Sequence, residues 1–229
     1  MPREEPPRIS VADQMRNIPT AHLAFFHEYL RNIREVGAIG PDSRDCVESL
    51  LRPVPFSSAR VILEFGSASG AVTRELIRRK KRDTLLICFE KNAAFYGRLA
   101  RDIAGENVFI LNRDVFGCES FLRERFGLCS GDVDCIVSTL PCSSLEFVQL
   151  LEGTAMPLLS TSGVFIQYMH TLSALKGFRL GPLLRGRFTT VTSEFVFRNL
   201  PPALVYACTS PIGRTDANKD RSSPQTLPS

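Results

Sequence analysis

The stretch Val61-Ile-Leu-Glu-Phe-Gly-Ser-Ala-Ser-Gly70 places an apolar run directly before a turn of small residues, and a helical pattern follows. Such a run is typical of a strand buried on both faces of a parallel sheet. Gly66, Ala68 and Gly70 let the backbone approach a ligand closely, and the N–H groups that open the helix can donate hydrogen bonds to it. A tight turn without a ligand has the same pattern, so both interpretations stay open. Glu64 narrows the ligand class, because its carboxylate repels a pyrophosphate and attracts a cation.

Strand-like and helical segments alternate along the rest of the chain, which predicts a doubly wound α/β sheet. Apolar runs lie at 60–65, 84–89, 107–111, 132–138 and 163–168, with helical patterns between them at 70–81, 92–103, 119–126 and 145–159. Two further β-type runs, at 187–197 and 202–209, are separated only by RNLP, which leaves no room for a crossover helix. The expected fold is a Rossmann-like seven-stranded sheet, with five alternating parallel strands, a terminal antiparallel hairpin and preceding N-terminal helices.

Length and composition predict one folded domain with polar ends. The chain has 229 residues, of which 44% are hydrophobic and 23% are charged. No apolar run reaches the ~18 residues that would span a membrane. Residues 1–20 are expected to form a flexible arm, and residues 210–229 a disordered tail. The predicted domain is 21–209, with a helical segment at 21–51.

Cysteine usage and charge restrict the compartment and the partners. Seven Cys are scattered without a C-x-x-C pair and only three His are present, so neither a disulfide framework nor a metal site is expected. The charged, proline-rich start MPREEPPR lacks the apolar stretch of a signal peptide, which favours a cytoplasmic location. The net charge of +4 permits an anionic partner without requiring one, and so mild a charge argues against nucleic acid.

Acidic and small residues follow the other predicted strands. Glu90 comes 20 residues after Gly70, the offset at which a carboxylate binds both hydroxyls of a ribose. An acid that is stabilised by a helix dipole explains the same residue without a ligand. Asp114 follows the third strand, where it can bond an adenine amino group, and the fourth strand ends in Ser138-Thr-Leu-Pro-Cys142. Because open α/β sheets bind ligands at the carboxyl ends of their strands, these positions together predict a nucleoside site.

These features resemble a known family. E-x-G-x-x-x-G, an acid after the second strand, D-[VAI] after the third and a terminal hairpin resemble the class I S-adenosylmethionine-dependent methyltransferases. Four segments resemble bacterial phospholipid N-methyltransferases. FFHEYLRNIREVGAIGPDSR resembles their N-terminal helix and G-A-I-x-P-x-S element, and VSTLP resembles their S-x-L-P motif. FIQYMH resembles their F-x-Q-F-x-Y segment, and RNLPPALVY resembles their N-x-P-P-A-x-V-Y hairpin. The resemblance runs from about Phe25 to Tyr206. It implies S-adenosyl-L-methionine as cofactor and an amine phospholipid such as phosphatidylethanolamine as methyl acceptor.

The resemblance also implies cofactor-binding roles for the residues that match the family motifs. The methionine moiety is assigned to Gly66, Ser67, Ala68, Ser69 and Gly70, with Glu64 near its ammonium group. The ribose is assigned to Glu90 with Lys91, and the adenine to Asp114 with Val115. The floor of the methyl-transfer site is assigned to Ser138, Thr139 and Leu140.

Two residues at the end of the fifth strand are candidates for catalysis. Tyr168 and His170 are placed to orient the substrate amine or to accept its proton, and lining the pocket is the alternative role for each. His170 stands where the family often has tyrosine, and Ala68 stands where glycine is usual.

Two segments suit contact with a membrane. Residues 21–36 have an amphipathic pattern, which fits either a membrane-interface anchor or a core helix over the cofactor. Residues 171–187 set basic residues among Leu, Phe and Gly, which suits lipid phosphates and equally suits a solvated helix. Together with the resemblance, these patterns predict peripheral contact with an anionic membrane surface, at its inner face.

Three other functions stay open from the sequence. An enzyme like the rRNA adenine N-dimethylases shares the sheet and the cofactor motifs, but Ser138-Thr-Leu-Pro-Cys142 lacks the Asn and the aromatic residue of its N-[LI]-P-[FY] motif. A small-molecule methyltransferase would use residues 171–187 as a lid. A non-catalytic cofactor-binding protein is the third, and the departures at Ala68 and His170 motivate it.

Overall fold

A computed structural model describes residues 43–141, 143–170, 180–199 and 202–213. The predicted arm, the amphipathic helix at 21–36 and nearly all of the predicted tail lie outside these residues, as does most of the basic segment at 171–187. The division into arm, domain and tail therefore stays a prediction. In the part of the chain that is described, no helix is both long and apolar enough to cross a membrane.

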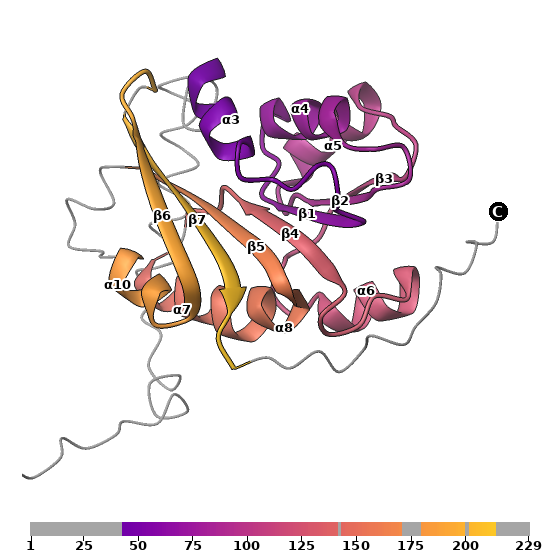
Figure 1. Ribbon diagram of the computed structural model, residues 1–229. Coiled ribbons are helices and arrows are strands. Elements are labelled where there is room, and N and C mark those ends of the chain that lie inside the picture. The colour runs from indigo at the N-terminus through magenta and orange to yellow at the C-terminus, as the bar shows by residue number, and fades with distance from the viewer. Residues whose placement is uncertain (1–42, 142, 171–179, 200–201, 214–229) are drawn as a thin grey trace, which may run out of the picture. The chain divides into compact units, whose positions relative to one another are not determined.

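A seven-stranded mixed sheet organises the described residues (Figure 1). Its strand order is β3-β2-β1-β4-β5-β7-β6. The strands are β1 Val61–Phe65, β2 Leu85–Phe89, β3 Val108–Leu111, β4 Val133–Ser138, β5 Leu159–His170, β6 Phe188–Val196 and β7 Ala203–Pro211. The first five are parallel, and β7 runs antiparallel to both β5 and β6. The predicted Rossmann-like sheet with a terminal hairpin is confirmed.

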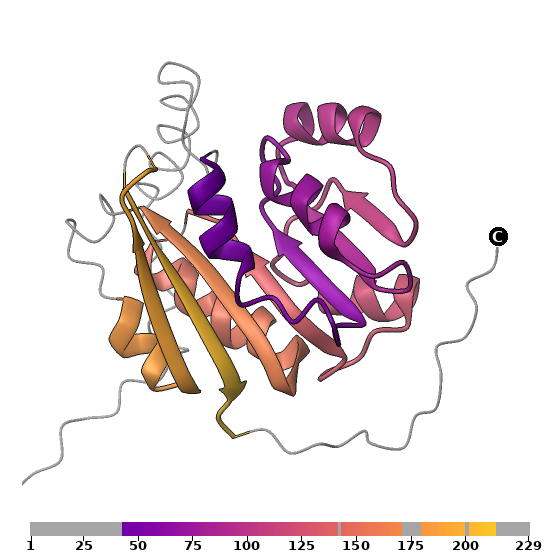
Figure 2. The same ribbon diagram turned by 45° about the horizontal axis from the view of Figure 1, so that its top comes forward.

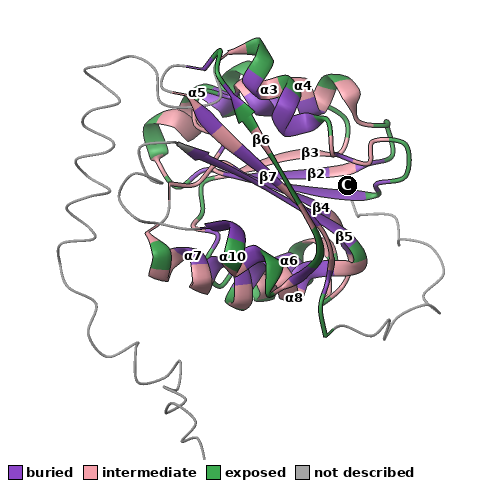
Figure 3. Ribbon diagram, turned by 60° about the vertical axis from the view of Figure 1, so that its left-hand side comes forward, coloured by how far each residue is buried: buried purple, intermediate pink, exposed green. Residues whose placement is uncertain are grey.

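Helices cover both faces of the sheet (Figure 3). One face carries α3 Arg44–Leu51, α4 Ala71–Arg79 and α5 Ala93–Asp102, and the other carries α6 Glu119–Phe126, α7 Ser144–Leu150, α8 Met156–Leu158 and α10 Leu180–Arg185. Neighbouring side chains of one strand enter opposite cores, since Ile62 packs with α3 and α4 while Leu63 packs with α7. Burial on both faces explains why these strands are apolar at nearly every position.

The helix predicted at 145–159 is confirmed in extent, but its second half is not regular α-helix. A capping box between Ser143 and Glu146 starts α7, but α-helical geometry ends at Leu150. A π-helical turn, η1 Leu151–Ala155, and the three-residue α8 follow. Pro157 contributes to this irregularity, because proline has no N–H to bond a carbonyl of the preceding turn.

β5 and β7 are longer than the apolar runs that predicted them, whereas β6 is one residue shorter at each end. β5 begins at Leu159 rather than at 163, because Leu159 pairs with Val133 before a register shift restores regular pairing at Cys135 and Val164. β7 continues to Pro211, which pairs with Phe188, and so extends past the predicted end of the strand at 209.

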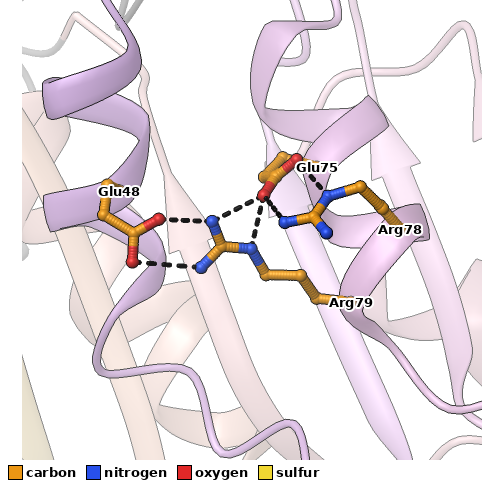
Figure 4. A network of polar contacts seen from close by, with 4 residues as sticks. All are labelled: Glu48, Glu75, Arg78 and Arg79. Carbon is orange, nitrogen blue, oxygen red and sulfur yellow. Dashed lines mark hydrogen bonds and ion pairs between the residues drawn. The ribbon is translucent and has the colours of Figure 1, made fainter.

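A charged network joins α3 to α4 (Figure 4). The Arg79 guanidinium bonds both Glu48 of α3 and Glu75 of its own helix. Arg78 also donates to Glu75, at 2.8 Å from its Nε. These hydrogen bonds, that from Arg78 first, lower the pKa of Glu75 to about 2. The network therefore links α3 to the helix that follows the small-residue turn after β1.

Candidate functional site

The turn between β1 and α4 depends on two glycines. Gly66 and Gly70 have φ angles of +85° and +80°, a region that L side chains rarely adopt. A Cβ on Gly70 would lie 2.4 Å from Leu99 Cδ2, and one on Gly66 would lie 2.9 Å from Leu140 Cδ2. Ala68 has φ +43° despite its Cβ, at a cost of ~1–2 kcal/mol. The tight turn predicted from the sequence is therefore present, and its two glycines leave no place for a Cβ.

Hydrogen bonds hold this turn against the end of β2. The N–H groups of Gly66 and Ser67 donate to the carbonyl of Phe89, at 2.9 and 3.3 Å. The N–H of Gly70 donates to Ser67 O at 2.7 Å, and the Arg74 guanidinium donates to Ser69 O at 2.9 Å. The turn is thus a closed loop in which both serine carbonyls accept hydrogen bonds.

Glu64 is fully buried at the end of β1. Its Oε2 accepts hydrogen bonds from Thr73 Oγ1 at 2.7 Å and from Ser67 Oγ at 2.9 Å. Its Oε1 is buried with no N–H or O–H donor among the described residues. Burial raises the pKa of Glu64, and hydrogen bonds from Thr73, the Cys88 thiol and Ser67 act in the opposite direction. One carboxylate oxygen therefore organises the turn, and the other is available to a donor.

Glu90 connects the turn to the start of α5. This side chain is 7% exposed, and its Oε2 accepts a hydrogen bond from the Ala68 N–H at 2.8 Å. Its Oε1 accepts from the Asn92 N–H at 2.7 Å, and Asn92 in turn caps α5. Burial raises the pKa of Glu90, while both backbone donors lower it. Each carboxylate oxygen keeps a further lone pair, so the group can still accept two hydroxyl donors.

The end of β3 lies beside the end of β2. Lys91 Nζ forms an ion pair with Asp114 Oδ2 at 2.6 Å, and Asp114 Oδ1 accepts the Phe116 N–H at 3.3 Å. The Asn112 amide donates to the carbonyls of Glu90 and Lys91. Val115 is buried, at 4% exposure, while the Lys91 and Asp114 side chains are partly exposed. This corner therefore combines an apolar side chain with an accessible carboxylate.

The end of β4 closes the turn from the other side. The Thr139 hydroxyl donates to Gly66 O at 2.5 Å, and the Thr139 N–H donates to Phe65 O at 3.0 Å. Leu140 lies against Gly66, because a Cβ added to Gly66 would come within 2.9 Å of Leu140 Cδ2. Ser138 is fully buried, and its hydroxyl finds no partner among the described residues. The predicted floor residues thus lie next to the predicted cofactor turn.

Gln167 of β5 faces Ser138 in the sheet register. Its amide nitrogen donates to Tyr168 O at 2.6 Å and to Leu140 O at 3.3 Å. Its Oε1 is buried and accepts no hydrogen bond from the described residues. Two unsatisfied polar oxygens, Ser138 Oγ and Gln167 Oε1, therefore occur on paired residues at the carboxyl ends of β4 and β5.

The two predicted catalytic residues end β5. Tyr168 is 4% exposed, and its hydroxyl accepts a hydrogen bond from Asn199 Nδ2 at 3.1 Å. Asn199 is also buried and belongs to the connection between β6 and β7. The backbone of His170 pairs with Ala203, and its side chain lies outside the described part of the structure.

Sequence reasoning missed four side chains around this site. Thr73 bonds Glu64, Cys88 faces Glu64 in the sheet register, Gln167 pairs with Ser138, and Asn199 bonds Tyr168. Gln167 carries a signal that local reasoning can use, since an amide in an apolar strand requires partners. The others are ordinary residues in their segments. Within the described residues, no group of three His, Cys, Asp or Glu side chains could hold a metal ion.

The fold and the site together define a class of protein. The strand order, the antiparallel β7, the glycine turn after β1 and the acids that follow β2 and β3 form the arrangement of the class I S-adenosylmethionine-dependent methyltransferases. Solved methyltransferase structures share this fold. One is a precorrin-6y C5,15-methyltransferase from Geobacter metallireducens, with TM-score 0.53 and 17% identity over 72% of this chain and 88% of the other. Another is an S-adenosylmethionine-dependent O-methyltransferase from Thermotoga maritima, with TM-score 0.53 and 17% identity over 80% of this chain and 71% of the other.

A curated relative makes the resemblance more specific. The chain is 28% identical over 187 residues to an ornithine lipid N-methyltransferase from Singulisphaera acidiphila. The aligned residues cover 80% of this chain and 93% of the relative. No family model matches the chain. The predicted resemblance to methyltransferases that act on lipid amines is therefore confirmed.

Proposed function

We propose that this chain is an S-adenosylmethionine-dependent methyltransferase that methylates the amine of a lipid. The observation that carries the proposal is the joint between Ala68 and Glu90, where the glycine turn and a buried carboxylate meet at the carboxyl edge of the sheet. This edge is where open α/β sheets bind nucleotides and related ligands.

The residues present fit S-adenosylmethionine. Gly66 and Gly70 place no side chain at the two ends of the turn, and the buried Oε1 of Glu64 lacks a hydrogen-bond donor among the described residues, which an ammonium group would supply. Glu90 has lone pairs for two ribose hydroxyls. Asp114, together with the buried Val115, offers an acceptor and an apolar surface for an adenine. Lys91, Ser67, Ser69 and Ala68 complete the proposed cofactor-binding set.

When bound, S-adenosylmethionine supplies a methyl group that its positive sulfur already activates. The chain then has to align the amine and exclude water. We assign Ser138 Oγ and Gln167 Oε1 to the amine hydrogens, because both are buried oxygens that lack a hydrogen-bond donor among the described residues. An amine that leaves water for this site has its pKa lowered, which favours the neutral form with a free lone pair. In this proposal His170 accepts the departing proton, or Tyr168 relays it by giving up its own hydroxyl proton to solvent as it takes up the proton of the amine.

The substrate class rests on the sequence resemblance. Phosphatidylethanolamine is the acceptor expected from the phospholipid N-methyltransferase motifs, and an ornithine lipid is the second acceptor to test because of the similar curated protein. Such substrates reside in membranes, so the proposal places the chain at the cytoplasmic face of a membrane as a peripheral protein.

The test uses full-length protein, S-adenosylmethionine labelled in its methyl group, and separate detergent micelles of phosphatidylethanolamine, ornithine lipid and phosphatidylcholine. Label in either of the first two lipids, with none in phosphatidylcholine, supports the proposal. Label only in RNA or in a soluble amine would establish one of the alternatives instead. Glu90→Ala should reduce labelling when S-adenosylmethionine is below saturation, whereas Glu124→Gln should not, since Glu124 is an exposed acid on α6.

A further inference from the structure

The end of β6 and the connection that follows it expose two aromatic side chains. Phe197 is 79% exposed and Phe195 is 41% exposed. Their rings contact each other edge to face, with centroids 4.3 Å apart. Phe197 is the most exposed of the large hydrophobic residues in the described part of the chain. We call Phe195, Phe197 and the adjacent Arg198 the hairpin tip.

The hairpin tip lies at the same edge of the sheet as the proposed site. Val196 and His170 both pair with Ala203, so β6 and β5 end at the same level. β5 and β4 are parallel, and their paired residues Gln167 and Ser138 precede this end by a few positions. Figures 1 and 2 show the tip beside the end of β5 in both views.

A cation accompanies the aromatic pair. The Arg198 side chain is 85% exposed, and its guanidinium lies 3.4 Å from Asp45 Oδ2 of α3. An exposed ion pair at this distance is weak, so the guanidinium can exchange this partner for another anion at little cost. The tip therefore presents two apolar rings and one available cation on the same side as the site.

We propose that the hairpin tip docks on an anionic phospholipid bilayer, with the rings of Phe195 and Phe197 entering the interface and Arg198 binding lipid phosphates. This inference rests on the proposed lipid methylation, since a lipid amine has to reach Ser138 and Gln167 from the bilayer. Two rings on a narrow turn offer much less surface than the ~800 Å² that each partner buries in a typical protein interface. A bilayer accepts so small an apolar protrusion, and its phosphates match the cation.

The chain lacks tryptophan, which makes a fluorescence test specific. F197W places the one indole of the chain in the tip. I212W is the matched control, because Ile212 is 52% exposed and lies just beyond the opposite end of β7. The probes are vesicles of phosphatidylcholine mixed with phosphatidylglycerol, with and without brominated acyl chains. F197W emission should shift to the blue and be quenched by the brominated lipid, whereas I212W emission should do neither.

Sedimentation with the same vesicles measures affinity. Phe197→Ser should weaken binding about tenfold, and Arg198→Gln should weaken it about fivefold on anionic vesicles. Neutral vesicles should show no effect of Arg198→Gln. Protein that binds vesicles without a shift in F197W emission, or protein that binds none, overturns the docking proposal. If F197W emission shifts to the blue without vesicles and the protein has the mass of a dimer, the proposal is overturned, because the hairpin tip then binds a second copy of the chain.

The outcome for docking is separable from that for methylation. In detergent micelles, Phe197→Ser should methylate lipid at the wild-type rate, because no bilayer has to be reached. On vesicles its kcat/KM should fall about tenfold. Loss of methylation in micelles by the wild-type protein would instead refute the proposed function itself.

Discussion

The N–H of Ala68 donates a 2.8 Å hydrogen bond to Glu90 Oε2, and this contact joins the turn after β1 to the acid after β2. The two residues are far apart in sequence but adjacent because β1 and β2 pair in parallel from Val61 with Leu85 to Phe65 with Phe89. Glu90 therefore holds the left-handed Ala68 in place while keeping lone pairs for a ligand. Cofactor affinity and the conformation of the turn are expected to depend on this one carboxylate.

The first prediction concerns Glu90 and Asp114. Glu90→Ala and Asp114→Ala should each weaken S-adenosylmethionine binding by roughly 1–3 kcal/mol, because partner groups of the ligand lose their acceptors. Titration calorimetry on the purified protein measures this. Glu124→Gln, on exposed α6 surface, should bind with wild-type affinity. Wild-type affinity in both Ala variants would refute the assignment of these acids.

The second prediction concerns the buried Glu64. Burial raises the pKa of Glu64 in the folded protein above the ordinary 4.5. The protonated group therefore contributes to the stability of the fold fully below pH 4.5, and this contribution is lost as pH rises through the pKa of the folded state. Glu64→Gln keeps an oxygen acceptor for Thr73 and Ser67 but does not ionise. The free energy of unfolding of the variant should therefore increase relative to that of the wild type as pH rises. Denaturant unfolding over a pH series measures the difference, and a difference that is constant with pH would contradict the argument.

The third prediction compares two changes in the same turn. Gly70→Ala should destabilise the protein by ~2 kcal/mol or more, because a Cβ there meets Leu99 Cδ2 at 2.4 Å and φ is +80°. Ala68→Gly should leave stability unchanged or raise it by up to ~1 kcal/mol, because it relieves φ +43° but frees the unfolded chain. Thermal and denaturant unfolding measure both. Equal losses in the two variants would show that the left-handed conformations are not the cause.

The contiguous features of this chain could be predicted from its sequence. Runs such as VILEF and the turn that ends at Gly70 are local, and burial on both faces produces them directly. The π-helical turn after Leu150 and the early start of β5 were not predicted. The early start of β5 depends on pairing between Leu159 and Val133. That pairing is a long-range contact that no local period reports.

The candidate site divides in the same way. Glu64, Glu90 and Asp114 were predicted, since strand ends and spacing mark them. Their partners were not: Thr73 bonds Glu64 from the following helix, and Asn199 bonds Tyr168 from another part of the sheet. A hydrogen bond between residues that are distant in the sequence depends on the final packing, so single-sequence patterns cannot contain it.

The fourth prediction concerns the network between α3 and α4. Hydrogen bonds from Arg78 and Arg79 lower the pKa of Glu75 to about 2, so its stabilising contribution is complete above pH 4.5 and is lost as pH falls toward about 2. Arg79→Gln should cost about 1 kcal/mol of unfolding free energy at neutral pH and low salt. Its deficit relative to the wild type should shrink in acid and in high salt. Arg123→Gln, on α6, is the matched control, and an equal loss there would assign the effect to net charge.

The last prediction concerns Tyr168, whose buried hydroxyl accepts a hydrogen bond from Asn199 at 3.1 Å. If Tyr168 relays the proton of the substrate amine, passing its own hydroxyl proton on in exchange, Tyr168→Phe should lower kcat about 100-fold, the scale of a lost acid–base group. The affinity for S-adenosylmethionine should not change, because the phenol is not assigned to cofactor binding. Stability should fall by only ~1 kcal/mol, because the ring remains and one hydrogen bond is lost. Asn199→Ala removes the same bond but keeps the phenol, so it separates the two roles: its kcat should stay well above that of Tyr168→Phe. Single-turnover rates of methyl transfer in lipid micelles measure these effects. An unchanged rate in Tyr168→Phe would exclude the phenol as the relay and leave His170, and His170→Gln would then have to show the loss.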